Sequence, residues 1–172
     1  SAIKSINTSN SSTAILHGET GSGKTRVYIE LSKQAVAQGK SVLVLTPEIA
    51  LTPQLVRTFE EQFSNVQITH SHLTPARRRR LWDALSRANE PTIVIGPRSA
   101  LFMPIPRIGL IVIDEFHESA YKNEQTPHYN AVRVAAKLAH IHRAKLVLGS
   151  ATPSVSEYFF AEQKQIPIIR MK

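Results

Sequence analysis

The segment Gly18-Glu19-Thr20-Gly21-Ser22-Gly23-Lys24-Thr25 constrains the fold of this chain more than any other stretch. It matches the phosphate-binding loop pattern G-x-x-x-x-G-K-[ST] at every fixed position. An apolar run at 14–16 precedes it, and apolar residues follow it at three- and four-residue spacing over 27–35. This order predicts a buried strand, a loop and the first turn of a helix. Backbone N–H groups and the helix dipole would then favour an anion at the loop.

Two side chains of the loop supply what nucleotide chemistry needs. The pattern places Lys24 at the β- and γ-phosphates and the Thr25 hydroxyl on Mg²⁺. Glycines at 18, 21 and 23 let the backbone fold closely around phosphate oxygens. The loop therefore predicts a site for a nucleoside triphosphate with Mg²⁺. The alternative, a glycine-rich turn without a ligand, is disfavoured by the flanking strand and helix patterns.

Apolar runs and amphipathic stretches alternate along the rest of the chain. Further buried strands are expected at 41–45, 66–69, 92–95, 110–113, 145–148 and 166–169. Helices are expected to begin near 53, 74, 130 and 154, and residues 118–129 are expected to form a loop. Strands that are apolar throughout are typical of a parallel sheet covered on both faces. We therefore expect an α/β fold, with residues 1–172 as a single domain.

The amino-acid composition excludes several classes of protein. The 172 residues include no cysteine, which excludes disulfides and zinc–thiolate sites, and no apolar run approaches the length of a membrane span. We expect a cytoplasmic protein without a membrane partner. The formal net charge of +8 suits a polyanionic partner, and a basic surface kept for solubility remains the alternative. The seven histidines do not form a convincing metal site, and Arg77–Arg80 cover every direction of a helical turn, which favours a solvated surface.

A pair of acids follows the apolar run at 110–113. Asp114 is placed to hold Mg²⁺, directly or through water, and Glu115 to orient and activate an attacking water. Two solvent-exposed acids at a strand end are the alternative, which a phosphate-binding loop in the same chain disfavours.

These residues also carry a family resemblance. Asp114-Glu115-Phe116-His117 resembles the DExH box of superfamily 2 helicases, and Ser150-Ala151-Thr152 resembles their motif III. The segments GETGSGKTRVY, LTPEIALTPQ, HSHL, GPRSALF, DEFHESAYKNE and LGSATPS, in this order, resemble the PriA family (primosomal protein N′) of replication-restart helicases. The resemblance implies the first RecA-like lobe of a longer DNA helicase, which uses ATP and Mg²⁺. It implies single-stranded and forked DNA, a second RecA-like lobe and replication-restart proteins as partners.

The resemblance also implies roles for individual residues. His117 would couple the phosphate site to Ser150 and Thr152, and the track for single-stranded DNA would be bordered by Thr46, Pro47, Glu48 and Arg98. The chain departs from the family at Pro97, where Thr is usual, and at Phe116, where an acid is usual. The adenine-reading Gln of the family is not evident in residues 1–13.

Two other functions are consistent with parts of the sequence. A P-loop ATPase or kinase acting on a small molecule would explain the loop and the acids, but not Ser150-Ala151-Thr152 or the basic excess. A non-enzymatic docking module for replication proteins is the second alternative.

Overall fold

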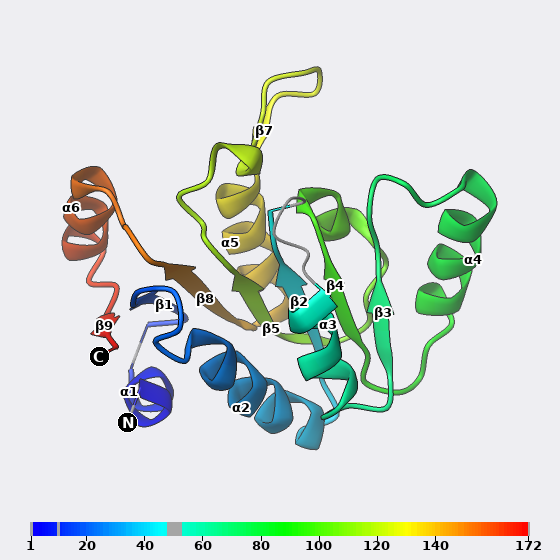
Figure 1. The fold of residues 1–172 in the computed structure, drawn as a ribbon, viewed down its shortest axis with the longest axis horizontal. Helices are drawn as coiled ribbons and strands as arrows, with labels where there is room; N and C mark the ends of the chain where they lie inside the picture. The colour runs from blue at the N-terminus through cyan, green and yellow to red at the C-terminus, as the bar shows by residue number, and fades with distance from the viewer. Residues whose placement is uncertain (1, 10, 48–52, 172) are drawn as a thin grey trace.

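The computed structural model describes residues 2–9, 11–47 and 53–171. Its centre is a seven-stranded sheet in the order β3-β4-β2-β5-β8-β1-β9, in which every neighbouring pair is parallel (Figure 1). The strands of this sheet are β1 (Thr13–His17), β2 (Ser41–Leu45), β3 (Val66–Ile68), β4 (Ile93–Gly96), β5 (Ile108–Ile113), β8 (Lys145–Ser150) and β9 (Ile168–Arg170). The α-helices are α1 (Ala2–Thr8), α2 (Lys24–Ala37), α3 (Pro53–Glu60), α4 (Pro75–Ser86), α5 (Ala131–His142) and α6 (Val155–Gln163). The predicted α/β fold with a mostly parallel sheet is confirmed.

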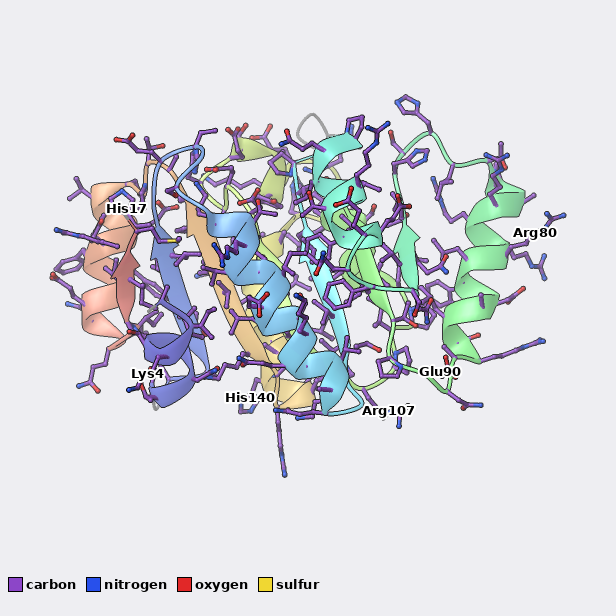
Figure 2. The ribbon with its side chains drawn as sticks, turned by 60° about the horizontal axis from the view of Figure 1, so that its bottom comes forward. Lys4, His17, Arg80, Glu90, Arg107 and His140 are labelled. Carbon is purple, nitrogen blue, oxygen red and sulfur yellow. The ribbon has the colours of Figure 1, made fainter. Side chains whose placement is uncertain are left out.

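The inner strands of the sheet bury both of their faces. In β2, Val42 and Val44 belong to a core that includes buried residues of α1, α2 and α3, whereas Leu43 and Leu45 belong to a core that includes residues of α5. Successive side chains of a strand point to opposite faces of the sheet, so the continuous apolar run serves two cores. Figure 2 shows α2 crossing one face of the sheet. His17 lies at the carboxyl end of its strand, and Arg107 and His140 lie toward the amino ends of the strands.

Several helices begin at the side chains that the sequence suggested. The Thr74 hydroxyl accepts a hydrogen bond from the Arg77 N–H, and the Asn130 side chain accepts from the N–H groups of Val132 and Arg133. These bonds satisfy amides that have no partner within the helix. Ser154 begins α6 with a reciprocal capping box.

The expected loop at 118–129 contains local structure. A 3₁₀ turn, η3 (Ser119–Tyr121), leads into a short antiparallel pair, β6 (Lys122–Asn123) with β7 (Tyr129–Asn130). The guanidinium of Arg98, in the 3₁₀ helix η2 (Arg98–Phe102), donates to the carbonyl oxygens of Ala120 and Lys122. Such bonds join residues more than twenty positions apart, which local sequence pattern does not reveal. The helix expected to begin near 53 is α3, which begins at Pro53, and the residue before it lies outside the described residues.

Candidate nucleotide and coupling site

The carboxyl ends of the parallel strands bring the predicted segments to one edge of the sheet. The Gly18 N–H, after β1, donates to the Ser150 oxygen, and the Asp114 N–H, after β5, donates to the Leu45 oxygen. The Thr46 N–H, after β2, donates to the Gly96 oxygen. Ligands of open parallel sheets bind at this edge.

The phosphate-binding loop has the backbone that its glycines permit. Gly21 and Gly23 have φ angles of 85° and 88°, which side chains rarely allow, and Gly23 lies directly before α2. A cavity of about 500 Å³ is lined by His17, Gly18–Ser22, Arg170 and Met171. The buried Ser22 hydroxyl oxygen has no hydrogen-bond partner among the described residues. An unpaired buried hydroxyl beside a glycine loop fits a polar ligand there.

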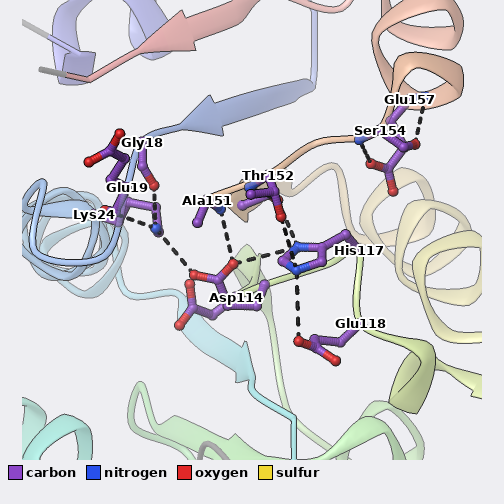
Figure 3. A network of polar contacts seen from close by, with 12 residues as sticks. Gly18, Glu19, Lys24, Asp114, His117, Glu118, Ala151, Thr152, Ser154 and Glu157 are labelled. Atoms are coloured by element: carbon purple, nitrogen blue, oxygen red, sulfur yellow. Dashed lines mark hydrogen bonds and ion pairs between the residues drawn. The ribbon is translucent and has the colours of Figure 1, made fainter.

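Lys24 joins the loop to the acidic pair (Figure 3). It is 7% exposed, and its Nζ donates to the carbonyl oxygens of Gly18 at 2.5 Å and Glu19 at 3.3 Å. The same nitrogen lies 3.2 Å from Oε1 of Glu115. A nearly buried ammonium with three oxygen partners has a fixed position within the loop.

Glu115 is held in an unusual conformation. Its φ angle is 47°, in the left-handed region that is uncommon for residues other than glycine. Its Oε2 accepts a hydrogen bond from the Ala151 N–H at 3.0 Å and lies 3.5 Å from Nδ1 of His117. Backbone strain of this kind concentrates at functional sites, and the carboxylate here touches the loop lysine, β8 and His117.

Asp114 is enclosed by two tyrosines. Its Oδ1 accepts a hydrogen bond from the Tyr28 hydroxyl at 2.9 Å, and its backbone oxygen accepts one from Tyr121 at 2.6 Å. Burial raises the pKa of Asp114, while the bond from Tyr28 lowers it. Burial and the Asp114 charge raise the pKa of Tyr28 well above its usual value, so this hydroxyl remains a donor. Asp114 and Thr25 line one cavity of about 590 Å³, which also touches Thr20 and Gly21.

Asp114 and Thr25 are the two residues that the sequence analysis predicted to hold Mg²⁺. No group of three or more His, Cys, Asp or Glu side chains within the described ranges could hold a metal ion. Mg²⁺ needs no such cluster, because it is usually bound through one or two carboxylates, waters and substrate phosphates. Asp114 and Thr25 have the oxygen donors that such a site requires.

His117 connects Glu115 with the last residue of β8 and the segment that follows it (Figure 3). Its Nδ1 lies 2.7 Å from the Ser150 hydroxyl, and its Nε2 lies 3.5 Å from the Thr152 hydroxyl and 3.7 Å from Oε1 of Glu118. Ser150 also accepts a hydrogen bond from the Thr152 N–H at 3.1 Å. The structure therefore brings together the three residues that the sequence analysis expected to be coupled.

The expected DNA-track residues lie farther along the same edge. Thr46, Pro47 and Arg98 line a cavity of about 260 Å³, and the Thr46 hydroxyl is buried without a partner among the described residues. Arg98 donates through Nη1 to two backbone oxygens, as above, and through Nη2 to the Asn123 side chain at 2.9 Å. Its guanidinium thus holds the 118–123 segment, a role that the sequence did not suggest. Glu48 lies outside the described residues.

The two departures from the family pattern have local structural consequences. Pro97 precedes η2 with an extended backbone, so its missing N–H falls before the first turn. Phe116 is 7% exposed and packs in the core shared with α5, and its N–H donates to the Gly149 oxygen at 3.0 Å. An apolar side chain suits this buried position.

Sequence reasoning did not identify several residues beside the site. Tyr28 appeared there only as part of the helix periodicity, although its spacing from Lys24 places both on one helix face. Arg170, the last residue of β9, and Met171, which follows it, reach the loop because β9 pairs with β1. A pairing between strands so distant in sequence has no local signal.

Comparison with known proteins gives consistent results. The family model described as DEAD/DEAH box helicase matches residues 1–159. The chain is 43% identical over 159 residues to the replication restart protein PriA of Bacillus subtilis, covering 92% of this chain and 20% of that protein. It is 45% identical over 153 residues to PriA of Synechocystis sp., covering 88% and 18% respectively. The chain thus spans about a fifth of the length of these relatives.

Solved structures agree in fold. RecG bound to a three-way DNA junction superposes with a TM-score of 0.68 at 18% identity, covering 99% of this chain and 22% of that one. The helicase MrfA bound to DNA and AMPPNP gives 0.61 at 21% identity, covering 93% and 24%. At these identities the likeness establishes the fold alone, and it confirms the RecA-like architecture. The similarity to PriA predicted from the motifs is also confirmed, and the chain belongs to the DEAD/DEAH box helicase family.

Proposed function

We propose that this chain is the first RecA-like lobe of an ATP-dependent DNA helicase of replication restart, excised from a longer protein. The observation that carries the proposal is the 3.2 Å ion pair between Lys24 of the phosphate-binding loop and Glu115, beside a cavity shared by Thr25 and Asp114. The similarity to PriA over about nine-tenths of the chain supports replication restart as the setting. A role on replicating DNA also implies a cytoplasmic location. Within the described residues, no helix is both long and apolar enough to span a membrane.

Each group of residues in the site has its own role in ATP hydrolysis. The N–H groups of Gly18–Thr25 and the Lys24 ammonium bind and orient the phosphates. The Thr25 hydroxyl and the Asp114 carboxylate would hold Mg²⁺, which would neutralise charge on the phosphates. Glu115 orients the attacking water and accepts its proton. Its left-handed backbone and the bond from Ala151 fix the direction in which that carboxylate points.

His117 gives this chemistry a connection to DNA binding. The bonds of His117 to Ser150 and Thr152 join the carboxylate of Glu115 to the segment after β8. A change in the position of Glu115 therefore changes the hydrogen bonds of Ser150 and Thr152. In this proposal the track for single-stranded or forked DNA is bordered by Thr46, Pro47, Glu48 and Arg98. A second lobe supplies arginines to the γ-phosphate, and replication-restart proteins act as partners.

The alternatives have different consequences. An ATPase or kinase acting on a small molecule would not need the links from His117 to Ser150 and Thr152. A non-enzymatic docking module would not need the Lys24–Glu115 pair at the loop. Neither alternative is favoured by a specific contact of the described residues.

The test is phosphate release by the full-length protein, with and without single-stranded DNA. Turnover should rise with DNA, and Glu115→Gln should reduce it about a hundredfold or more, because general base catalysis contributes about that factor. The variant should still bind ATP with Mg²⁺. DNA-independent turnover in the parent would instead favour a small-molecule enzyme, and unchanged turnover in Glu115→Gln would exclude Glu115 as the base.

A further inference from the structure

Tyr28 is a buried side chain to which the phosphate-loop pattern gives no role. Its ring is completely buried in the core beneath α2, and its hydroxyl donates to Oδ1 of Asp114 at 2.9 Å. We propose that Tyr28 is a positioning residue, which holds the Asp114 carboxylate toward the Mg²⁺ site, and that residue 149 is a glycine to make room for it. The inference rests on the proposed function, because it takes Asp114 to be the metal-holding acid.

Two side chains on one face of α2 contact the two acids, Asp114 and Glu115. Lys24 and Tyr28 are four residues apart and therefore lie one above the other on the helix. Lys24 pairs with Glu115 and Tyr28 bonds to Asp114, so two successive turns of α2 contact two successive residues after β5. The phosphate-binding helix thereby sets the positions of both carboxylates relative to its own loop.

Gly149, in β8, leaves the space that the tyrosine hydroxyl occupies. A Cβ atom at Gly149 would lie 1.7 Å from the Tyr28 oxygen, 3.0 Å from its Cζ and 3.3 Å from Oδ1 of Asp114. Glycine within a strand weakens it and often marks a close approach of another group. Here that group is the end of the Tyr28 side chain, so any larger residue at 149 would displace the hydroxyl from Asp114.

The contact between Tyr28 and Asp114 differs from ordinary core packing, because it joins a hydroxyl to a carboxylate oxygen. A phenylalanine would fill the same apolar space, so the hydroxyl is needed for its bond rather than for volume. Tyr121 supplies the contrast, because it donates to the backbone oxygen of Asp114 and supports the main chain. Groups that bond to a metal-holding carboxylate typically change metal affinity about tenfold to a hundredfold when removed.

The experiment measures binding of the ATP analogue AMPPNP to the 172-residue chain as MgCl₂ is increased, alongside thermal unfolding. Tyr28→Phe should raise the Mg²⁺ concentration for half-maximal binding about tenfold. Tyr121→Phe should lower the unfolding midpoint about as much as Tyr28→Phe does, because each variant loses one buried hydrogen bond. It should change the Mg²⁺ requirement less than about twofold, since the bond of Tyr121 is to the backbone. In full-length protein, excess Mg²⁺ should restore most of the turnover of Tyr28→Phe.

Gly149→Ala extends the test to the space around the hydroxyl. In the parent it should raise the Mg²⁺ requirement at least as much as Tyr28→Phe. In the Tyr28→Phe background it should add less than about twofold, because the 1.7 Å contact is gone and coupled sites are not additive.

Each outcome separates the inference from the proposed function. Equal Mg²⁺ requirements for Tyr28→Phe and the parent, with or without a lower unfolding midpoint, overturn the positioning role and leave the proposed function standing. AMPPNP binding by the parent that does not respond to Mg²⁺ contradicts the proposed function, and the role of Tyr28 with it.

Discussion

Two parts of the same sheet edge are built in different ways. At the ends of β1, β5 and β8, side chains meet side chains: Lys24 pairs with Glu115, Tyr28 bonds to Asp114, and His117 bonds to Ser150. At the ends of β2 and β4, Arg98 mainly contacts backbone oxygens of a segment 22 to 24 residues away. The first part depends on the identities of residues within short motifs. The second depends on the path of the chain, so its contacts cannot be recognised from a short stretch of sequence.

The largest effect is expected in the first part. Lys24→Ala removes a nearly buried cation aimed into the phosphate loop, so affinity for Mg-AMPPNP should fall about a hundredfold or more. The fold should persist, because Lys24 lies at the loop and belongs to neither hydrophobic core. Lys137→Ala, on the exposed side of α5, removes the same charge and should leave binding unchanged. Equal affinities for Lys24→Ala and the parent would mean that the loop does not bind phosphate.

Coupling within the first part should give a smaller effect. Ser150→Ala removes the hydroxyl that lies 2.7 Å from His117 and that accepts from the Thr152 N–H. In full-length protein we expect stimulation of phosphate release by DNA to fall about tenfold, which is the value of roughly one hydrogen bond. Release without DNA should change little. A proportional loss with and without DNA would show that Ser150 supports the hydrolytic site rather than its link to DNA.

The contrast also explains how far the sequence could predict the structure. The apolar strands and the caps at Thr74 and Asn130 are local patterns, and the structure confirms them. The phosphate loop and Asp114–His117 were found because their chemistry is contiguous in the chain. The hairpin at 122–130 was missed because its anchor is Arg98, and Tyr28 was missed because it lies outside both motifs and its partner is 86 positions away.

Arg98 tests whether the second part contacts DNA directly or through the segment it holds. Arg98→Ala should weaken binding to single-stranded DNA about fivefold in either case, because it removes either a contact to a phosphate or the bonds that hold the 118–123 segment. Arg98→Lys separates the two, because it keeps the charge but cannot bridge Ala120, Lys122 and Asn123 as a planar fork does. We expect Arg98→Lys to bind as weakly as Arg98→Ala. A lysine variant with parental affinity would assign Arg98 to a phosphate, and Arg98→Ala should then reduce the salt slope by about one.

The smallest effect is expected at Asn123, within the hairpin itself. Its Oδ1 accepts from Arg98, and its Nδ2 donates to the oxygens of Gln125 at 3.1 Å and Pro127 at 2.8 Å. These bonds are exposed or only partly buried, so Asn123→Ala should cost about 1 kcal/mol of local stability. Amide hydrogen exchange should therefore speed up about fivefold over 122–130, with little change in the global unfolding midpoint.

Asn65→Ala is the matched control for this local effect. Asn65 also uses its side-chain amide for two bonds, to the Pro91 oxygen and the Thr92 hydroxyl, at the opposite edge of the sheet. Its exchange effect should be confined to the residues around 91–93. If Asn123→Ala instead slowed nucleotide binding or exposed amides of α2, the hairpin and the phosphate loop would form one cooperative unit. The two parts of the edge would then be linked by more than the chain that connects them.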